Sequence, residues 1–222
     1  MKNKDFFSNF FVVNDPASKK NFRGEITGKI GDFAQLLRGE FTKKQIDVKH
    51  LEGGKEPSQL FWNTVCDPFC VNEEVLRILK ENELTGWKAI PATVTDKNKK
   101  KWKNYFAITV TGRTNHIDYM DSVIVFNKMP GGLFPSFKGL YFTPDTWDGS
   151  DIFMERADNN GKATAFVYVT KRLVDIFKKH KITNVDFLNF NEFEMDCSSV
   201  IIGADDEKYV AMLEKKIAKA SA

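Results

Sequence analysis

Residues 71–89 read VNEEVLRILKENELTGWKA, and residues 169–187 carry the same pattern as VTKRLVDIFKKHKITNVDF. The two stretches align without a gap, and apolar residues match apolar residues along their length. The alignment predicts an internal pseudo-repeat in which each copy is an amphipathic helix followed by a strand. The matched pairs are Val71 and Val169, Val75 and Leu173, Ile78 and Ile176, Leu79 and Phe177, Lys80 and Lys178, Leu84 and Ile182, and Thr85 and Thr183.

Each copy also has the residue types that begin and end a helix. Asn72 and Thr170 are expected to cap the helices, because a short polar side chain can accept a hydrogen bond from a free backbone N–H of the first turn. Gly86 and Asn184 follow the helices, and these two residue types best tolerate the left-handed conformation at a helix end. Two copies are too few for a solenoid, which needs at least about three. We therefore expect a pseudo-symmetric mixed sheet with helices packed on it.

Most of the remaining chain is predicted to form strands. Residues 104–112 show this best, because apolar residues alternate with polar or small ones at the period of a half-buried strand. The whole chain, residues 1–222, is predicted to be a single α+β domain: a mixed, mostly antiparallel sheet with the two repeat helices and a C-terminal helix packed on it. Strands are expected at 10–13, 24–30, 45–51, 89–95, 104–112, 122–127, 139–142 and 164–170, and helices at 32–40 and 205–220, where Asp205 or Asp206 is the expected cap.

The composition indicates a globular protein, with 42% hydrophobic and 28% charged residues. The 20 phenylalanines favour a sheet-rich aromatic core. The net charge of +3 is too small to indicate a nucleic-acid partner, and no stretch approaches the ~20 apolar residues of a membrane span. Three cysteines cannot make a complete disulfide framework, which fits a reducing compartment. We therefore expect a cytoplasmic protein with no membrane partner.

Common catalytic and cofactor motifs are absent from the sequence. It contains no G-x-S-x-G elbow, no G-x-G-x-x-G and no P-loop. Cys66 and Cys70 lie four residues apart, but a zinc site needs four ligands, and the other cysteine and the histidines are scattered. Buried thiols are the favoured interpretation. We expect no cofactor and no metal.

Residues 95–104 concentrate lysines around Trp102. Such a stretch can hold single-stranded nucleic acid by charge and stacking. It also lies between two predicted strands and contains turn-forming residues, which favours an exposed hairpin loop.

The stretch GLYFTPDTWDGSDIFM at 139–154 places Asp145, Asp148 and Asp151 at every third residue. An EF-hand loop needs ligands at every second residue, so this spacing does not match one. Spacing by three suits successive turn and cap positions, and Asp148 with Gly149 forms a strong turn dipeptide. The pattern favours a turn over a cation site.

His116 lies in GRTNHIDYMD, two residues from Asp118 and three from Arg113. The three side chains could form an acid–base arrangement, since arginine supplies a fork of donors. A histidine satisfied within its own loop is the favoured alternative.

The segment GLYFTPDTWDGSDIF, preceded by GRTNHIDYMDS and followed by the second repeat copy, resembles a bacterial family of immunity proteins of polymorphic toxin systems. This family is immunity family eleven, formerly a domain of unknown function. The resemblance covers roughly residues 60–193 and is carried by the DGSDIF segment and the paired helix–Thr–strand units. It implies a cytoplasmic protein that binds and neutralises a cognate toxin encoded by a neighbouring gene. It implies no catalytic residues.

A non-catalytic binding protein is therefore the leading prediction, with Trp147, Asp148, Asp151, Arg113 and His116 as partner-binding residues. Inhibitors of nucleases tend to be acidic, whereas this chain is mildly basic, so the aspartates are the expected acidic face. The alternative is a metal-dependent enzyme in which Asp148 and Asp151 hold a cation and His116 is the base. It requires that these side chains converge on one pocket, whereas binding requires an exposed patch. A nucleic-acid binder led by the lysine loop is the third interpretation.

Overall fold

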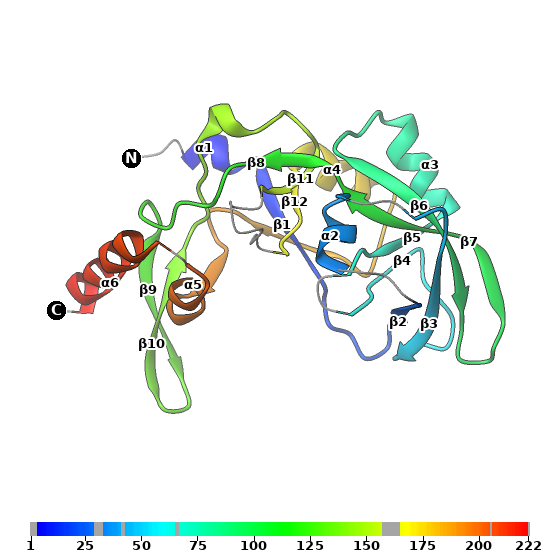
Figure 1. Cartoon of the computed structure of the whole chain (residues 1–222), viewed down its shortest axis with the longest axis horizontal. Coiled ribbons are helices and arrows are strands. Elements are labelled where there is room, and N and C mark those ends of the chain that lie inside the picture. Colours follow the sequence, from blue (N-terminus) through cyan, green and yellow to red (C-terminus); the bar gives the residue numbers. More distant parts are fainter. Residues whose placement is uncertain are drawn as a thin grey trace.

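The computed structural model describes residues 4–28, 33–40, 43–64, 67–156, 165–204 and 206–221. The protein has the predicted α+β class, with mixed, mostly antiparallel sheets and a C-terminal helix. The strands of the described ranges form three sheets rather than one. Two of these sheets form the body of the molecule, and the third carries a projecting hairpin (Figure 1).

The largest sheet is built from the first half of the chain and lies on the right in Figure 1. All its neighbouring strands run antiparallel except the second and third in spatial order, which run parallel. In spatial order the strands are β2 (Arg23–Thr27), β3 (Ile46–Glu52), β6 (Trp87–Thr95), β7 (Lys101–Val110), β5 (Cys70–Asn72) and β4 (Leu60–Phe61).

The second sheet combines an N-terminal strand with strands from the second half of the chain. Only its last two strands run parallel. In spatial order the strands are β13 (Asp186–Asn189), β1 (Phe10–Asn14), β12 (Tyr168–Thr170), β11 (Ile152–Glu155) and β8 (Gly112–Thr114).

The third sheet is antiparallel throughout, and a tight turn at 130–131 joins its two longer strands. These strands form the hairpin that projects from the body in Figure 1. In spatial order the strands are β14 (Glu194–Asp196), β10 (Gly132–Lys138) and β9 (Val123–Met129).

The helices are short except for the C-terminal one. None of those in the described ranges is long and apolar enough to cross a membrane. Their bounds are α1 (Lys4–Phe7), α2 (Phe33–Leu37), α3 (Glu73–Glu81), α4 (Lys171–Lys179), α5 (Cys197–Gly203) and α6 (Glu207–Ser221), with a 3-10 helix η1 at Pro144–Thr146.

The two repeat stretches follow the same course through their sheets. The first runs β5–α3–β6, and its two strands flank β7; the second runs β12–α4–β13, and its two strands flank β1. In both cases the flanking strands are antiparallel to the strand between them and therefore parallel to each other. This arrangement is a split β-α-β unit. The predicted order of helix and strand is present in each copy, and a short strand precedes each helix.

The ends of α3 and α4 match residue by residue. Gly86 and Asn184 have φ of 86° and 65°, in the left-handed region, but they lie beyond the helix ends. The left-handed residues at the ends of α3 and α4 are Glu83 and Lys181, with φ of 49° and 54°, so the helices end earlier than expected.

Asn72 occupies the N-cap of α3, where its side chain accepts a hydrogen bond from Val75 N. Thr170 occupies the N-cap of α4 but makes no side-chain capping bond. The hydroxyl of Thr170 donates instead to the Asp151 carboxylate.

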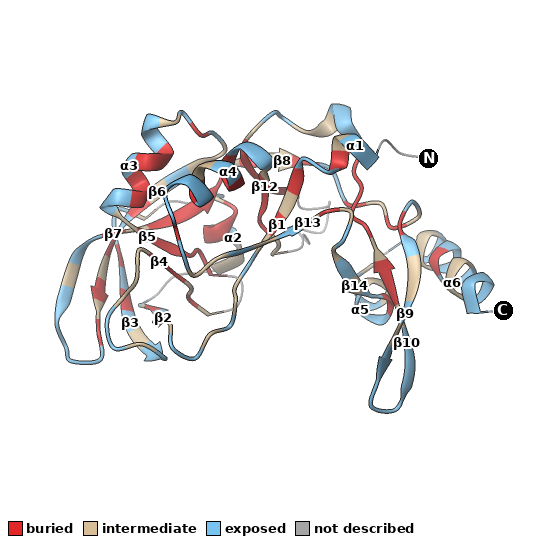
Figure 2. Cartoon of the chain, turned by 180° about the vertical axis from the view of Figure 1, so that it is seen from behind, coloured by how far each residue is buried: buried red, intermediate tan, exposed pale blue. Residues whose placement is uncertain are grey.

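The core consists of three clusters, and the central one lies between the two large sheets. Alternate residues of one strand serve different clusters: Val71 and Val169 face the central cluster, while Cys70 and Tyr168 face the outer two. The buried faces of α3 and α4 both contribute to the central cluster. The two repeat copies therefore share one core, while the β9–β10 hairpin extends away from it, largely exposed (Figure 2).

Two expectations about individual elements need correction. Residues 139–142 are not a strand: the segment is irregular, with φ of 94° at Gly139, and its amides bond to separate loop carbonyls of Phe190 and Phe193. The segment is apolar because it is buried. In a sequence, a buried irregular segment of four residues cannot be distinguished from a short buried strand. The strand expected at 164–170 begins only at Tyr168.

The C-terminal helix begins as predicted after an aspartate. The Asp206 carboxylate accepts hydrogen bonds from Lys208 N and Tyr209 N at 2.9 and 3.3 Å, which is the capping role. Asp205 and Cys66 lie outside the described residues. Burial raises the pKa of the Cys70 thiol to about 12, so this thiol is held in its protonated form.

Candidate functional site

The predicted site is a loop that runs from η1 to β11, and its tryptophan is partly built into the core. Trp147 is half-buried, and its ring packs edge-on against Phe10 with 5.0 Å between centroids. A second contact joins it to Phe153 at 5.8 Å. Its indole Nε1 donates to Ser150 O at 3.1 Å, which closes the loop on itself. The indole therefore anchors the loop and leaves part of its surface exposed.

Asp148 is exposed, and its carboxylate holds the loop in shape. One oxygen accepts from Ser150 N at 3.0 Å, which is an Asx turn, and Gly149 between them has φ of 84°. The other oxygen accepts from Arg113 N at 2.8 Å, which ties the turn to β8. The turn predicted at Asp148-Gly149 is present, and the carboxylate is the group that stabilises it.

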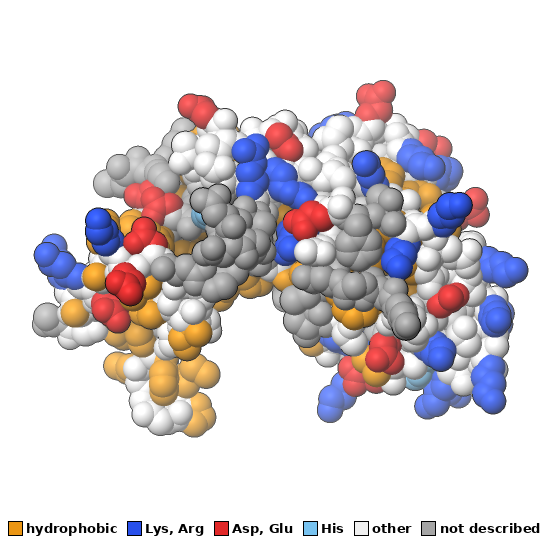
Figure 3. All heavy atoms as spheres, in the orientation of Figure 1, with side chains coloured by type: hydrophobic (Ala, Val, Ile, Leu, Met, Phe, Trp, Pro, Cys, Tyr) orange, Lys and Arg blue, Asp and Glu red, His pale blue; other side chains and the backbone are white. Residues whose placement is uncertain are grey.

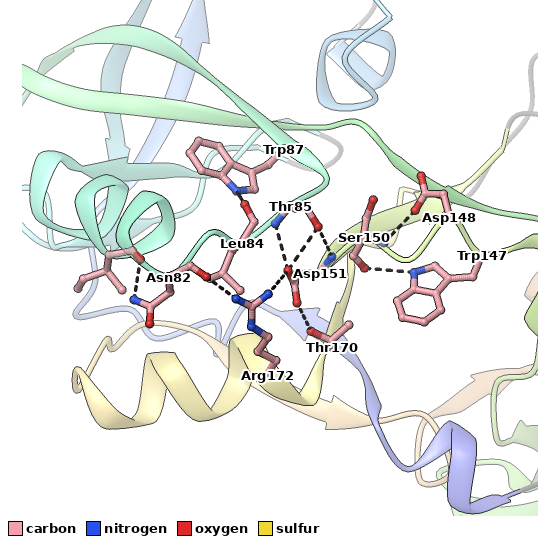
Figure 4. A network of polar contacts seen from close by, with 11 residues as sticks. Asn82, Leu84, Thr85, Trp87, Trp147, Asp148, Ser150, Asp151, Thr170 and Arg172 are labelled. Atoms are coloured by element: carbon pink, nitrogen blue, oxygen red, sulfur yellow. Dashed lines mark hydrogen bonds and ion pairs between the residues drawn. The ribbon is translucent and has the colours of Figure 1, made fainter.

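Asp151 is buried, and its carboxylate connects the two repeat copies (Figure 4). One oxygen accepts from the Thr170 hydroxyl at 2.9 Å. The other accepts from Arg172 Nη1 at 3.0 Å, from Thr85 N at 3.1 Å and from the Thr85 hydroxyl at 3.3 Å. Thr85 follows the helix of the first copy, and the other two residues begin the helix of the second. Asp151 therefore lies inside the protein as a connecting residue, instead of on a surface open to a partner.

The first copy makes a related connection with different chemistry. Gln59 directly precedes β4, just as Asp151 directly precedes β11. The Gln59 carbonyl accepts a hydrogen bond from the N–H of the α3 N-cap residue at 2.8 Å. In the second copy, the Asp151 carbonyl accepts one from Thr170 N, the α4 N-cap, at 3.0 Å. The Gln59 side chain donates to Glu74 Oε2 at 3.0 Å. Glu74 aligns with Arg172. Equivalent positions thus carry an exposed amide–carboxylate contact in one copy and, in the other, an ion pair and hydrogen bonds around a buried carboxylate.

The Arg113 side chain bonds to backbone carbonyls next to the loop. Its guanidinium donates to the carbonyls of Val110 and Gly112, each at 2.8 Å, and also to the carbonyl of Arg38. Burial is the main cause that lowers the pKa of this guanidinium from its usual value. The donor fork expected to reach a partner or His116 is therefore occupied by backbone carbonyls of β7, of β8 and of Arg38, the residue after α2.

His116 is exposed, and the acid near it comes from another part of the chain. Its Nδ1 lies 3.4 Å from Glu155 Oε2, while the second oxygen of Glu155 accepts from the Tyr168 hydroxyl at 2.8 Å. Glu155 is buried on β11. Asp118, the nearer acid in sequence, accepts from Met120 N at 2.9 Å and bends its own loop. Sequence spacing missed Glu155 because it lies 39 residues from His116.

The alternative enzyme prediction needs Asp148 and Asp151 around one cation. Their carboxylates instead accept hydrogen bonds from different segments, and Figure 4 shows them directed to separate partners. Nowhere in the described ranges do three or more His, Cys, Asp or Glu side chains gather in a way that could hold a metal. The carboxylate placement therefore disfavours the proposed cation site.

A thermal-shift measurement tests this directly. Because both carboxylates are already satisfied by protein donors, we expect ~1–10 mM Mg²⁺ or Ca²⁺ to shift the melting temperature by less than about 1 °C. The matched control is the same ionic strength of NaCl. A rise of several degrees that disappears in Asp148→Asn would contradict this expectation and revive the cation site.

A further exposed feature escaped the sequence interpretation. The β9–β10 hairpin presents large apolar side chains to solvent, visible as the orange projection at the lower left of Figure 3. The signal in the sequence is the run VIVF at 123–126, which is apolar at consecutive residues, where a half-exposed strand would alternate. The large apolar side chains are exposed because the hairpin projects beyond both large sheets, and the apolar sequence 123–126 does not indicate this projection.

The five predicted site residues thus divide by exposure. Asp148 and His116 are exposed and Trp147 is half-buried, while Arg113 and Asp151 support the loop through protein contacts. The candidate partner surface is therefore the exposed part of residues 143–149 together with His116, which we call the turn face.

No protein-family model matches this chain, and no curated protein matches it.

Proposed function

We propose that this chain is a non-catalytic binding protein, a cytoplasmic immunity protein that neutralises a cognate bacterial toxin by stoichiometric binding. The partner is a protein toxin encoded by a neighbouring gene. The proposal combines the resemblance of residues 60–193 to immunity proteins with one structural observation. That observation is the exposed turn face, which is held in a single shape by its own hydrogen bonds.

Rigidity is the property that supports binding. Asp148 bonds in two directions, Trp147 closes the loop onto Ser150, and Asp151 holds the following strand. A loop that is already ordered loses little conformational entropy when a partner binds, so more of the contact energy appears as affinity. Arg113 and Asp151 contribute by positioning, and the direct contacts come from the exposed groups.

The charge of the turn face indicates the kind of surface it would meet. Asp145 and Asp148 are both exposed in a chain whose net charge is +3, so the acidic character is local. A local acidic surface steers association with a basic partner surface and suppresses acidic ones. The exposed part of Trp147 would supply the apolar contact near the centre of such an interface.

Charge reversal at Asp145 tests the proposal with little risk to the fold, because Asp145 is exposed and takes no part in the bonds that hold the turn. We expect Asp145→Lys to raise the dissociation constant for the toxin domain encoded beside this gene at least ~10-fold, equivalent to about 1.4 kcal/mol. Isothermal titration calorimetry measures both the affinity and the stoichiometry, for which we expect one to one.

Asp175→Lys is the matched control, since Asp175 is an exposed acid on α4 that forms a surface ion pair with Lys171. It should leave the affinity within about twofold. Binding that survives Asp145→Lys unchanged would move the interface away from the turn face. If no protein encoded by the neighbouring genes binds the folded chain, the immunity proposal is wrong.

A further inference from the structure

The β9–β10 hairpin has an open edge. In the part of the chain that the structure describes, β9 pairs with β10 on one side and with no strand on the other. Its neighbour at the base is α6, where Lys216 Nζ donates to the carbonyls of Met120 and Ser122. The helix therefore lies beside the start of β9, and the distal residues Val125–Met129 extend beyond it (Figure 1).

The register shows which backbone groups face outward. Phe126 pairs with Pro135, which has no N–H, so this pair cannot exchange hydrogen bonds across the hairpin. The N–H and C=O of Phe126 must therefore point away from β10. Because the pattern alternates along an antiparallel ladder, those of Ile124 and Lys128 also point outward. The outer edge of β9 thus offers donors and acceptors for another strand.

This edge has one of the features that usually prevent strand addition, a lysine near its tip, and lacks the others. Natural edge strands are protected by charged side chains such as lysine, by proline, by a bulge or by shortness. β9 is seven residues long, reads VIVFNKM and pairs with β10 without a register shift. Its single charge is the exposed Lys128. A long, regular and apolar open edge of this kind is a site for pairing with another chain.

We propose that β9 pairs antiparallel with β9 of a second copy of this chain, forming a symmetric dimer with one continuous sheet. In the proposed register, Asn127 of one copy lies opposite Asn127 of the other, and the distal residues of the two strands pair on either side of it. Val125 then lies opposite Met129 of the second copy, and Phe126 lies opposite Lys128, so no like charges are opposed. The lysine can lie over the aromatic ring of its cross-strand neighbour.

The exposed apolar area agrees with this role. Each of five hairpin side chains exposes between 39% and 66% of its surface. At about 150–200 Å² for a fully exposed side chain of this size, the total is roughly 500 Å², near the upper range for the largest apolar patch of a monomer. A stable interface buries roughly 800 Å² on each partner. The rest of this area would come from the polar rim of the interface and from the backbone of the paired strands. The five residues are Val123, Phe126, Met129, Leu133 and Phe134.

A groove beside the hairpin adds to this surface. It is open, has a volume of about 400 Å³ and is lined mainly by apolar side chains of α5, α6 and β10. Ile202 at its border is 83% exposed, the most exposed large apolar side chain of the described residues. Pairing of two hairpins would bring the second copy next to this groove and extend the buried apolar area.

The first test is the mass of the purified full chain in solution. We expect light scattering coupled to gel filtration, over about 1 to 100 µM, to give a mass that rises from the 25.4 kDa of one chain towards twice that value. A mass of one chain at every concentration would overturn the proposal. The toxin is not needed, so this test is independent of the proposed immunity function.

Two substitutions of matched exposure locate the interface. Phe126→Lys would place a lysine opposite Lys128 of the second copy, so we expect it to raise the dissociation constant of the dimer at least ~100-fold. Leu188→Lys is the control, because Leu188 is 41% exposed against 39% for Phe126 and lies on β13, an edge strand of another sheet. The Leu188→Lys dimer should have the same dissociation constant as the wild-type dimer. A dimer that persists in Phe126→Lys, or that is lost equally in the control, would overturn the proposal.

A cysteine at the centre of the register tests strand pairing itself. In the proposed dimer the two Asn127 residues form a non-hydrogen-bonded pair with Cα atoms about 4.5 Å apart, within disulfide range. We expect Asn127→Cys to form a covalent dimer under mild oxidation that the wild type does not form. Mass spectrometry then locates the bridge at residue 127 and distinguishes it from a bridge through one of the three native cysteines. Failure of a dimeric Asn127→Cys protein to cross-link would overturn the strand pairing.

Discussion

Replacing Gly86 by alanine is expected to lower the free energy of unfolding by about 4 kcal/mol or more, which is a large share of the stability of a typical domain. Gly86 has φ of 86°, and a Cβ built on it would lie 2.0 Å from Ile152 O and 2.6 Å from Ser150 Cβ. The first contact is with backbone, so it cannot be relieved by a side-chain rotation. The Gly86 carbonyl also accepts from Thr111 N and Gly112 N, which prevents the turn from moving away.

Gly149→Ala is the matched control, because Gly149 has φ of 84° and a Cβ there would meet nothing within 4 Å. It should cost only the left-handed conformation, about 1 kcal/mol. Urea denaturation followed by far-UV circular dichroism measures both variants. An insoluble Gly86→Ala with a soluble Gly149→Ala would agree with the expectation. Equal losses in the two variants would show that close approach of β11 to the turn is not what requires glycine at residue 86.

Asp151→Ala is expected to lower the free energy of unfolding by about 3 kcal/mol. Asp151 is buried, and removal of its carboxylate leaves the Thr85 N–H and the Thr170 hydroxyl without the acceptor of two part-buried hydrogen bonds. A donor left unsatisfied away from water costs about 1–3 kcal/mol. The ion pair adds less, because the Arg172 side chain is 52% exposed and can be solvated once its partner is lost. Asp151→Asn keeps an acceptor oxygen, so we expect about half of the loss.

Gln59→Ala is the internal control for this prediction, since Gln59 occupies the equivalent place in the first copy. Its side-chain contact is exposed, so truncation should cost less than about 0.5 kcal/mol. Chemical denaturation of the two variants measures the difference directly. If Asp151→Ala lost no more stability than Gln59→Ala, the charged network would not be what joins the two copies.

The element pattern of the repeat copies was predictable because its signals are local. The capping side chain of Asn72 and an apolar period of helical length act within a few residues of each other. The exact helix end was not predictable in this way, because Glu83 and Lys181, which have positive φ there, are not of a residue type that signals it. The apolar stretch at 139–142 had no comparable signal. Apolar composition indicates burial, and burial occurs in strands and in irregular segments alike.

The α+β class, the two helix–strand units and the turn at Asp148-Gly149 were therefore determined by sequence alone, because each depends on contacts between near neighbours in the chain. The burial of Asp151, the approach of Glu155 to His116 and the open edge of β9 were decided by the tertiary structure. These three depend on which distant segments become neighbours when the two copies share one core. A carboxylate in a turn motif has the same local sequence whether it faces water or the partners that folding brings to it.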